Sequence, residues 1–505
     1  MLLADVVAAS LRVAATRSRN VKIAELSSVL SRAEPAEIPV VVGFLSGEPR
    51  QGRVGVGWAS MASASVPPAA DSSLTPADVD KLIDSIPTMT GPGSVQARRD
   101  AVAEVMARAT EAEQSYLVGL FTGGMRQGAL EGLVIDAVGV AANVERELVR
   151  RALMLGGSLP DTARIAMGGG AVALAAVRLE VMRPVRPMLA ATSSEPGEAV
   201  AELGDVIVDW KLDGARIQVH RMGSELRVFT RNLNDVTDRL PDVVASVRQL
   251  DVSSVVLDGE SLALTEDGSP RRFAETMSRF GSDGADAAVP LRPFFFDILH
   301  LDGRDLIDQP LIERLALLER VVPENLRIPS VRTTSPEAGA EVLATAIGAG
   351  HEGVMVKAAM STYDAGRRGS AWRKIKPVHT LDLVILAAEW GHGRRTGWLS
   401  NLHLGCLDPD TGAFVMLGKT FKGLTDEMLE WQTVRLLELE ERRTANTVWV
   451  RPELVVEVAL DGLVVSPRYP AGMALRFARV KGHRPDKGPD DVDTLAAVRQ
   501  IFERR

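Results

Sequence analysis

The segment Asp205-Val206-Ile207-Val208-Asp209-Trp210-Lys211-Leu212-Asp213-Gly214-Ala215-Arg216 places a lysine between two strand-like runs. The apolar run before Lys211 predicts a strand, Asp213-Gly214 predicts a turn, and residues 215–221 predict the strand that leaves it. Only ten of the 58 basic residues of the chain are lysine. Because lysine can lose its proton whereas arginine stays protonated, we interpret Lys211 as a nucleophile facing a cleft. A hairpin with a surface lysine is the alternative interpretation of this segment alone.

Composition sets broad limits on the class of protein. A length of 505 residues predicts two to four domains. The net charge of -8 means that any contact with nucleic acid must come from local groups of basic residues. The single cysteine, Cys406, excludes an intrachain disulfide and a multi-cysteine zinc site, and it fits a reducing compartment. Residues 1–16 predict an amphipathic helix, and no run reaches the roughly 18 apolar residues of a membrane span, so we expect a cytoplasmic protein.

Three domains are predicted: a helical domain over residues 1–182, a sheet-rich domain over 183–378 and a small β-barrel over 379–505. All six Asp-Gly dipeptides, which favour tight turns between strands, lie after residue 200. Arg183-Pro184-Val185-Arg186-Pro187 cannot continue a helix, and Lys376-Pro377 marks the second boundary. The predicted elements are helices within 95–120 and 128–142, a loop over 58–74, barrel strands at 381–388, 402–407, 413–417 and 454–460, and a barrel helix at 425–439.

Charged residues recur at the ends of further predicted strands. Val255 to Glu260 is a buried strand that ends in a carboxylate, and Phe294 to Asp297 is an aromatic strand. In the strand from His351 to Lys357, Glu352 is available to a metal or a ribose hydroxyl. Lys374 and Lys376 lie on one face of a strand, where their charges repel unless an anion lies between them. Each segment alone is compatible with an ordinary buried strand, but the ordered series is specific.

In order along the chain, the motifs resemble those of covalent nucleotidyltransferases, and most closely those of ATP-dependent DNA ligases of the bacterial and archaeal three-domain type. The segment Phe121 to Gly132 is similar to part of that family's helical DNA-binding domain. The resemblance implies a multidomain α+β fold with a helical DNA-binding domain, an antiparallel-sheet adenylation domain and a C-terminal OB-fold barrel. The motifs that carry it are Lys211-Leu212-Asp213-Gly214-Ala215-Arg216, Thr230-Arg231-Asn232, Leu257-Asp258-Gly259-Glu260, Phe296-Asp297, Glu352-Gly353-Val354-Met355-Val356-Lys357, Lys374-Ile375-Lys376 and Arg484-Pro485-Asp486-Lys487.

The resemblance also implies a reaction in three steps. Lys211 takes AMP from ATP, the AMP passes to the 5′ phosphate at a nick in duplex DNA, and the 3′ hydroxyl then displaces AMP. Each step is phosphoryl transfer by positioning and charge neutralisation, with Mg2+ or Mn2+ as the metal. The cations around Lys211 would favour its neutral amine and would then hold the phosphate.

The resemblance implies separate groups of residues that contact the nucleotide, the metal and the DNA. Phe296 would stack on adenine beside Asp209, and Glu260 and Arg216 would address the ribose. Glu260 and Glu352 would contact the metal, directly or through water. The phosphates would be held by Arg368, Lys374, Lys376, Arg484 and Lys487, and the DNA by Arg126 in the helical domain and by Arg231, which would meet the sugar or the 5′ phosphate.

Several other functions stay open at this stage. An RNA ligase or a GTP-using capping enzyme shares the lysine motif, and a non-catalytic DNA-binding protein could keep the fold. The chain has no Gly-x-x-x-x-Gly-Lys-Ser/Thr loop, which excludes the P-loop class of ATP users. It also has no four-cysteine cluster, which favours ATP over NAD within the ligases. We expect a monomer that encircles nicked duplex DNA without a membrane partner, and the sequence does not reveal which proteins are its partners.

Overall fold

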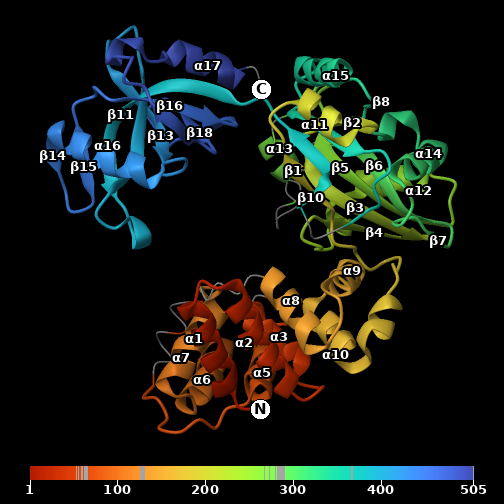
Figure 1. Cartoon of the computed structure of the whole chain (residues 1–505). Coiled ribbons are helices and arrows are strands. Elements are labelled where there is room, and N and C mark those ends of the chain that lie inside the picture. The colour runs from red at the N-terminus through yellow and green to blue at the C-terminus, as the bar shows by residue number, and fades with distance from the viewer. Residues whose placement is uncertain are drawn as a thin grey trace.

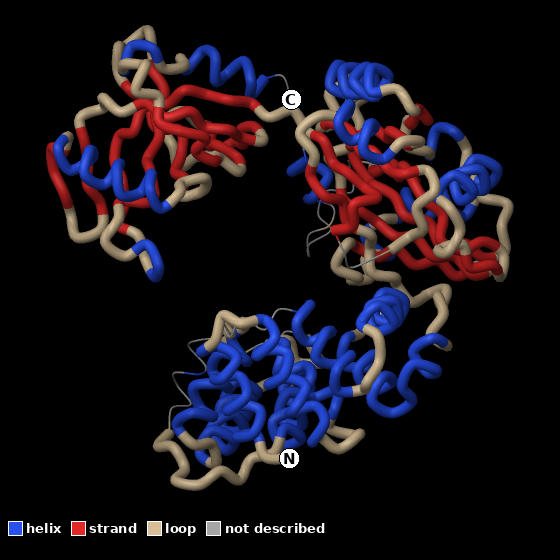
Figure 2. The backbone as a smooth tube through the Cα atoms, in the orientation of Figure 1, coloured by secondary structure: helices blue, strands red, loops and turns tan. Residues whose placement is uncertain are grey.

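The chain forms a helical region followed by two regions rich in strands, as Figures 1 and 2 show. The computed structural model describes residues 1–505 except 53, 55, 58–60, 62–65, 126–130, 267, 272, 279, 281–289, 365–367 and 504–505, together with the side chains of 273, 274 and 368. Arg126, part of the predicted loop over 58–74 and the start of the predicted helix at 128 therefore lie outside the described residues.

The helical region packs around one apolar core. Residues 95–120 form two helices rather than one, because Thr110 caps a new helix and Glu113 completes its capping box. Thr75 caps the helix that begins at Pro76, also with a capping box. The helices are α1 (Leu3–Ala15), α2 (Arg19–Arg32), α3 (Ile38–Ser46), α5 (Pro76–Ser85), α6 (Ser94–Ala107), α7 (Glu111–Thr122), α8 (Glu131–Ala141), α9 (Arg146–Gly156) and α10 (Leu159–Ala175).

The middle region contains two five-stranded sheets. The first has the order β1-β10-β9-β2-β8 and is antiparallel except where β1 pairs with β10, and the second has the antiparallel order β4-β3-β5-β6-β7. The strands are β1 (Leu189–Thr192), β2 (Val206–Lys211), β3 (Ala215–Met222), β4 (Glu225–Thr230), β5 (Ser254–Ala263), β6 (Leu291–Leu301), β7 (Arg304–Asp305), β8 (Ser330–Thr333), β9 (Gly353–Ala358) and β10 (Arg368–Ile375).

This topology corrects the interpretation of the lysine segment. β2 and β3 are both present where the sequence predicts them, but they belong to different sheets, so Asp213-Gly214 crosses between sheets and does not close a hairpin. Apolar residues from both sheets, including Val256 and Trp372, share one core with α9. The outer helices are α11 (Pro196–Leu203), α12 (Pro241–Arg248), α13 (Phe273–Ser278), α14 (Leu311–Val321) and α15 (Pro336–Gly348).

The C-terminal region contains a seven-stranded antiparallel sheet, in which β11 pairs with three other strands, and a separate two-stranded sheet. The predicted strands and helix coincide with or overlap β11 (His379–Trp390), β12 (Leu399–Leu407), β13 (Phe414–Thr420), β16 (Val455–Leu460) and α16 (Asp426–Glu438). Six further elements lie where none was predicted from the sequence: β14 (Glu440–Arg443), β15 (Thr447–Val450), β17 (Gly462–Val465), β18 (Met473–Arg476), β19 (Arg479–His483) and α17 (Leu495–Glu503).

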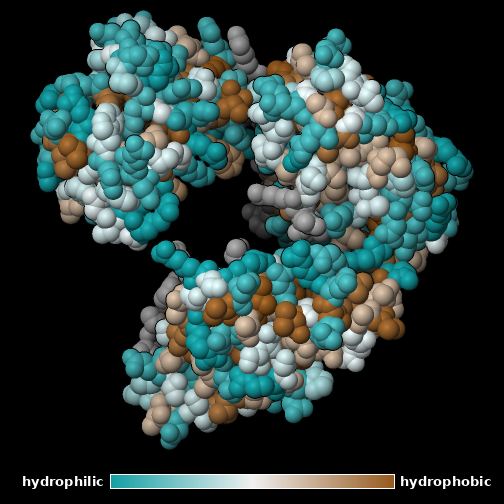
Figure 3. All heavy atoms as spheres, in the orientation of Figure 1, coloured by the Kyte–Doolittle hydropathy of each residue, from teal (hydrophilic) through white to brown (hydrophobic). Residues whose placement is uncertain are grey.

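The three regions surround an open space in the space-filling view of Figure 3, and hydrophilic residues line much of its edge. The predicted multidomain α+β fold, with a helical first region, an antiparallel-sheet core and C-terminal sheets, is confirmed. Among the described residues, no helix has the length and apolar character needed to cross a membrane.

Candidate active site

The candidate site forms around Lys211, the last residue of β2. Lys211 pairs with Gly353 at the start of β9, and its carbonyl oxygen accepts a hydrogen bond of 3.0 Å from the backbone N–H of Glu352. The Glu352 carboxylate binds the ammonium groups of both Lys211 and Lys376. The side chain of Glu352 is only 7% exposed, so its buried negative charge offsets the repulsion between the ammonium groups of Lys211 and Lys376.

The second sheet contributes Arg216 and Glu260, which pair across β3 and β5. The Arg216 guanidinium makes a bidentate contact with Asp258, at 3.0 Å from Nε and 2.7 Å from Nη2. Burial raises the pKa of Glu260 to about 7, against the opposing effect of Lys211 and Arg216, while the negative charges of Asp258 and Glu352 add to the rise. Glu260 is therefore a carboxylate whose protonated form is favoured chiefly by its burial.

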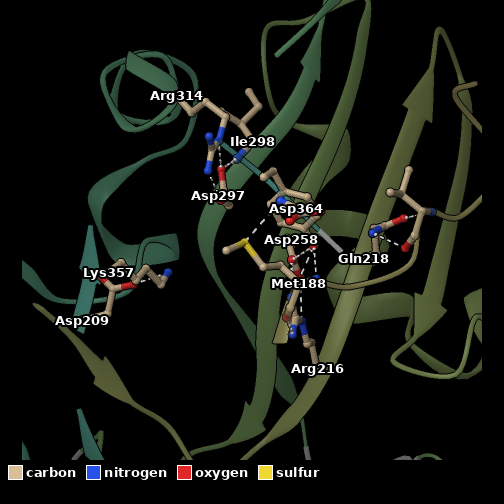
Figure 4. A network of polar contacts seen from close by, with 12 residues as sticks. Met188, Asp209, Arg216, Gln218, Asp258, Asp297, Ile298, Arg314, Lys357 and Asp364 are labelled. Carbon is tan, nitrogen blue, oxygen red and sulfur yellow. Dashed lines mark hydrogen bonds and ion pairs between the residues drawn. The ribbon is translucent and has the colours of Figure 1, made fainter. Parts of the chain in front are cut away.

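Asp209 and Lys357 form a buried ion pair on the first sheet, with 2.5 Å between Lys357 Nζ and Asp209 Oδ2. Burial raises the pKa of Asp209, and the charge of Lys357 opposes that rise. Lys357 Nζ also lies 4.3 Å from the ring centroid of Phe296 and 4.4 Å from that of Trp372. Figure 4 shows this pair apart from the group formed by Arg216 and Asp258. Phe296, which is predicted to stack on adenine, is 8% exposed and packs beside the Lys357 ammonium and the Arg216 guanidinium.

The residues predicted to hold a metal fit such an ion when phosphates share its coordination. Within the part of the chain that the structure describes, no group of three or more His, Cys, Asp or Glu could hold a metal alone. Glu260 and Glu352 nevertheless lie close enough for the charge of Glu352 to raise the pKa of Glu260. Because Mg2+ commonly takes one or two carboxylates together with waters and substrate phosphates, two glutamates are a sufficient donor set.

The C-terminal region approaches this site through residues other than Arg484 and Lys487, the two residues of that region predicted to hold phosphates. Arg476 of β18 lies 3.9 Å from Asp213, and Asp461 lies 3.9 Å from Lys376. Arg484 and Lys487 instead bind Asp382 on β11, at 3.3 Å and 2.5 Å. Arg484 also binds Asp486 at 2.7 Å. In this arrangement Arg484 and Lys487, which were predicted to hold phosphates, bind Asp382 and do not contact Lys211.

The other predicted residues take varied positions. Lys374 is part-buried in β10 and pairs with Met355 of β9 in the strand register. Arg231 is exposed in the turn that follows β4. The backbone of Arg368 begins β10, but its side chain lies outside the described part, as does the whole of Arg126.

Two buried residues beneath the site were missed by the sequence analysis. Tyr363 contacts Asp258 and Arg216 through its hydroxyl, and Arg314 binds Asp297 in a fully buried ion pair. Tyr363 is one of only three tyrosines in the chain. The rarity of its residue type, which singled out Lys211 among the basic residues, could also have singled out Tyr363.

Comparison with known proteins identifies the family. The chain matches the models for the ATP dependent DNA ligase domain at residues 187–376, the ATP dependent DNA ligase C terminal region at 395–487 and the DNA ligase N terminus at 58–139. It is 54% identical to a probable DNA ligase of Pseudarthrobacter chlorophenolicus and 55% identical to one of Nocardia farcinica, in each case over 99% of this chain and 100% of the relative. A solved structure described as Pmar-Lig_Pre has the same fold, with a TM-score of 0.64, 17% identity, and coverage of 95% of this chain and 99% of the other.

The two-sheet core with a lysine at the junction is that of a nucleotidyltransferase, and with these matches the chain belongs to the ATP-dependent DNA ligase family. It is an enzyme that uses ATP and Mg2+ to seal nicks in duplex DNA through a covalent lysyl-AMP intermediate. A lysine amine attacks the α-phosphorus of ATP and pyrophosphate leaves, the 5′ phosphate at the nick then displaces the lysine, and finally the 3′ hydroxyl displaces AMP.

Proposed function

We propose that Lys211 is the residue that carries AMP. The supporting observation is its position at the end of β2, where Glu352 binds both its ammonium and that of Lys376. Attack requires that a proton leave Lys211 Nζ, because only the neutral amine has a lone pair. The Glu352 carboxylate already accepts a hydrogen bond from that nitrogen, so Glu352 is the group best placed to receive the proton.

The roles of the surrounding residues follow from their place in the two sheets. We propose that Phe296 and Asp209 border the adenine, and that Arg216 and Glu260 contact the ribose. Glu260 and Glu352 would hold Mg2+, which when bound offsets charge on the departing pyrophosphate. Phosphate contacts are proposed for Arg368, Lys374, Lys376, Arg484 and Lys487.

Arg484 and Lys487 must change partners to take this role. Both bind Asp382 in the structure, so we propose that the C-terminal region rotates about residues 377–382 before AMP transfer to the lysine. The face that carries Arg476 would then leave Asp213. This proposal assigns the two orientations of the C-terminal region to different steps.

We further propose that the enzyme acts as a monomer that encircles nicked DNA, with domains over residues 1–182, 183–378 and 379–505. Arg231 is exposed and therefore accessible to a nucleic acid strand, and Arg126 is the proposed contact in the helical domain. A cytoplasmic location is proposed because ATP and DNA occur together there in bacteria such as those of the curated relatives.

Intact-mass measurement after incubation with ATP and Mg2+ tests the central proposal. The wild-type chain should gain the mass of one AMP, and Lys211→Arg should gain none because guanidinium has no available lone pair. Lys81→Arg, an exposed lysine on α5, is the matched control and should adenylate like the wild type. Adenylation of Lys211→Arg at the normal rate would assign the nucleophile to another residue.

Sealing assays on matched nicks then test the polynucleotide specificity. Joining of nicked duplex DNA is expected to exceed joining of the same nick in RNA. Preferential sealing of RNA would instead support the RNA ligase alternative, and adenylation without any joining would support a different acceptor.

A further inference from the structure

The hydroxyl of Tyr363 occupies a central position in the buried contacts next to the candidate site. Tyr363 follows β9 and is 2% exposed. Its hydroxyl donates a hydrogen bond of 2.6 Å to Asp258 Oδ2 and accepts one of 3.1 Å from the backbone N–H of Met188. Arg216 Nη2 lies at 3.3 Å as a third partner. The hydroxyl therefore serves as donor and acceptor at once, which fixes its orientation.

The partners of Tyr363 are also the partners of Arg216. Asp258 binds Nε and Nη2 of Arg216, and the carbonyl oxygen of Met188 accepts a hydrogen bond of 2.7 Å from Nη1. Figure 4 shows Met188, Asp258 and Arg216 gathered in one group. A guanidinium has five N–H donors. Among the described residues, one contact from Nε, one from Nη1 and two from Nη2 leave a single Nη1 donor for a ligand.

The ring of Tyr363 links the same group to the aromatic side of the site. It meets Trp372 edge to face at 6.0 Å between centroids, and Trp372 meets Phe296 in the same way at 6.2 Å. Arg216 Cζ lies 5.5 Å from the Phe296 centroid. The backbone N–H of Tyr363 donates to the Ile307 carbonyl oxygen at 2.8 Å, which anchors the tyrosine from the other side.

We propose that Tyr363 is a positioning residue for ATP binding: through Asp258 and Met188 it holds the Arg216 guanidinium so that its remaining N–H points at the nucleotide. The ligand class is the sugar or α-phosphate of a nucleoside triphosphate, because those are groups that accept a hydrogen bond from a fixed guanidinium. This inference rests on the proposed role of Arg216 in nucleotide binding.

Tyr363→Phe is the direct test, because it removes the hydroxyl and keeps the ring. Loss of one hydrogen bond to a charged group predicts a rise of about tenfold in the KM for ATP in single-turnover adenylation. The maximal rate and the fraction of chains that finally carry AMP should change little. A purely structural role would give the opposite pattern, since partial unfolding lowers the active fraction without weakening ATP binding by the folded molecules.

Tyr116→Phe is the matched control. The hydroxyl of Tyr116 is also buried, and it donates 2.7 Å to the carbonyl oxygen of Phe44 within the helical region. Its removal should lower the melting temperature by an amount comparable to Tyr363→Phe and leave the KM for ATP unchanged. An equal rise of KM in both variants would overturn the proposal.

A double-mutant cycle with Arg216→Lys tests whether Tyr363 acts through Arg216. If it does, the two substitutions together raise the KM by clearly less than the product of their separate effects. Fully multiplicative effects, or a wild-type KM in Tyr363→Phe, refute the positioning role. If Tyr363→Phe is too unstable at the usual assay temperature, the same cycle is run at a lower temperature, with the same two outcomes.

Failure of this inference is distinct from failure of the proposed function. If Lys211→Arg still adenylates, the assignment of the nucleophile is wrong whatever Tyr363 does. If Lys211→Arg is inert and Arg216→Lys leaves the KM unchanged, only the role of Arg216 fails. If both behave as proposed and Tyr363→Phe binds ATP normally, the positioning role alone is refuted.

Discussion

The buried ion pair between Asp297 and Arg314 gives the sharpest stability prediction. Arg314 of α14 contacts Asp297 of β6 at 2.7 Å from Nε and 2.9 Å from Nη2, and both side chains are 0% exposed. Arg314 Nη1 also donates to the carbonyl oxygens of Gln309 and Ser361. Figure 4 shows the fork-like contact between the two side chains. Asp297→Asn keeps the shape of the side chain and leaves the guanidinium buried without its counter-charge.

The expected loss follows from that burial. Removing one partner of a buried ion pair costs about 3–5 kcal/mol, because the other charge stays desolvated. For a domain of the size of residues 183–378, each kcal/mol shifts the melting temperature by about 2–4 °C. Asp297→Asn should therefore lower the melting transition of the middle region by roughly 6–20 °C.

Calorimetry of the full-length chain measures this shift, and the chain supplies its own control. Arg332 contacts Asp205 with the same fork-like geometry, at 2.9 Å and 2.6 Å, but the two side chains are 56% and 33% exposed. Asp205→Asn removes an equivalent charge where water can solvate the arginine, so the melting temperature should hardly change. Equal shifts in the two variants would refute the argument that burial, rather than the contact itself, determines the loss.

Three further predictions concern charge. The pKa of Glu260 in the folded protein, about 7, lies above the ordinary value of 4.5, so protonation of Glu260 stabilises the fold. As pH rises from roughly 4.5 to 7, the free energy of unfolding of the wild type should fall by about 3 kcal/mol relative to that of Glu260→Gln. Denaturation of both proteins without nucleotide measures this difference. A pH-independent difference between the two proteins would contradict that assignment. Asp382→Asn should release Arg484 and Lys487 and speed AMP transfer at low ATP by up to about fivefold, and a slower initial rate would argue against the proposed rotation. Binding of nicked DNA should weaken linearly with salt on logarithmic axes, and Arg231→Ala should reduce that slope by about 1 in titrations across a salt series; an unchanged slope would remove Arg231 from the DNA contacts.

Features that depend on local sequence were predicted well. The apolar run before Lys211 and the alternation after Gly214 correspond to β2 and β3. The barrel helix begins at Asp426 with Thr425 as its N-cap, where the sequence places it. Such elements carry their signal within a few residues, as capping and strand patterns do.

Features that depend on partners distant in the chain were missed. The hydroxyl of Tyr363 binds Asp258, which lies 105 residues earlier, and Arg314 binds Asp297 on a different element. Neither contact can be recognised from the residues next to it in the sequence. β14 is Glu440–Arg443, a wholly charged strand, so neither apolar alternation nor β-branched residues mark it. Its place in the sheet comes from pairing with β15.

The crossing between the two sheets explains why the lysine motif contains glycine although no hairpin is present. A Cβ atom at Gly214 would lie 2.5 Å from the carbonyl oxygen of Ser261 and 2.9 Å from Cγ of Glu260. At Gly353 a Cβ would lie 2.1 Å from the carbonyl oxygen of Ile375, next to Lys376. Both glycines therefore allow backbones to approach where a side chain would force them apart. Lys211 pairs with Gly353 in the first sheet, and Gly214 contacts β5 of the second sheet. The two glycines therefore bring the amine of Lys211 toward the carboxylate of Glu260.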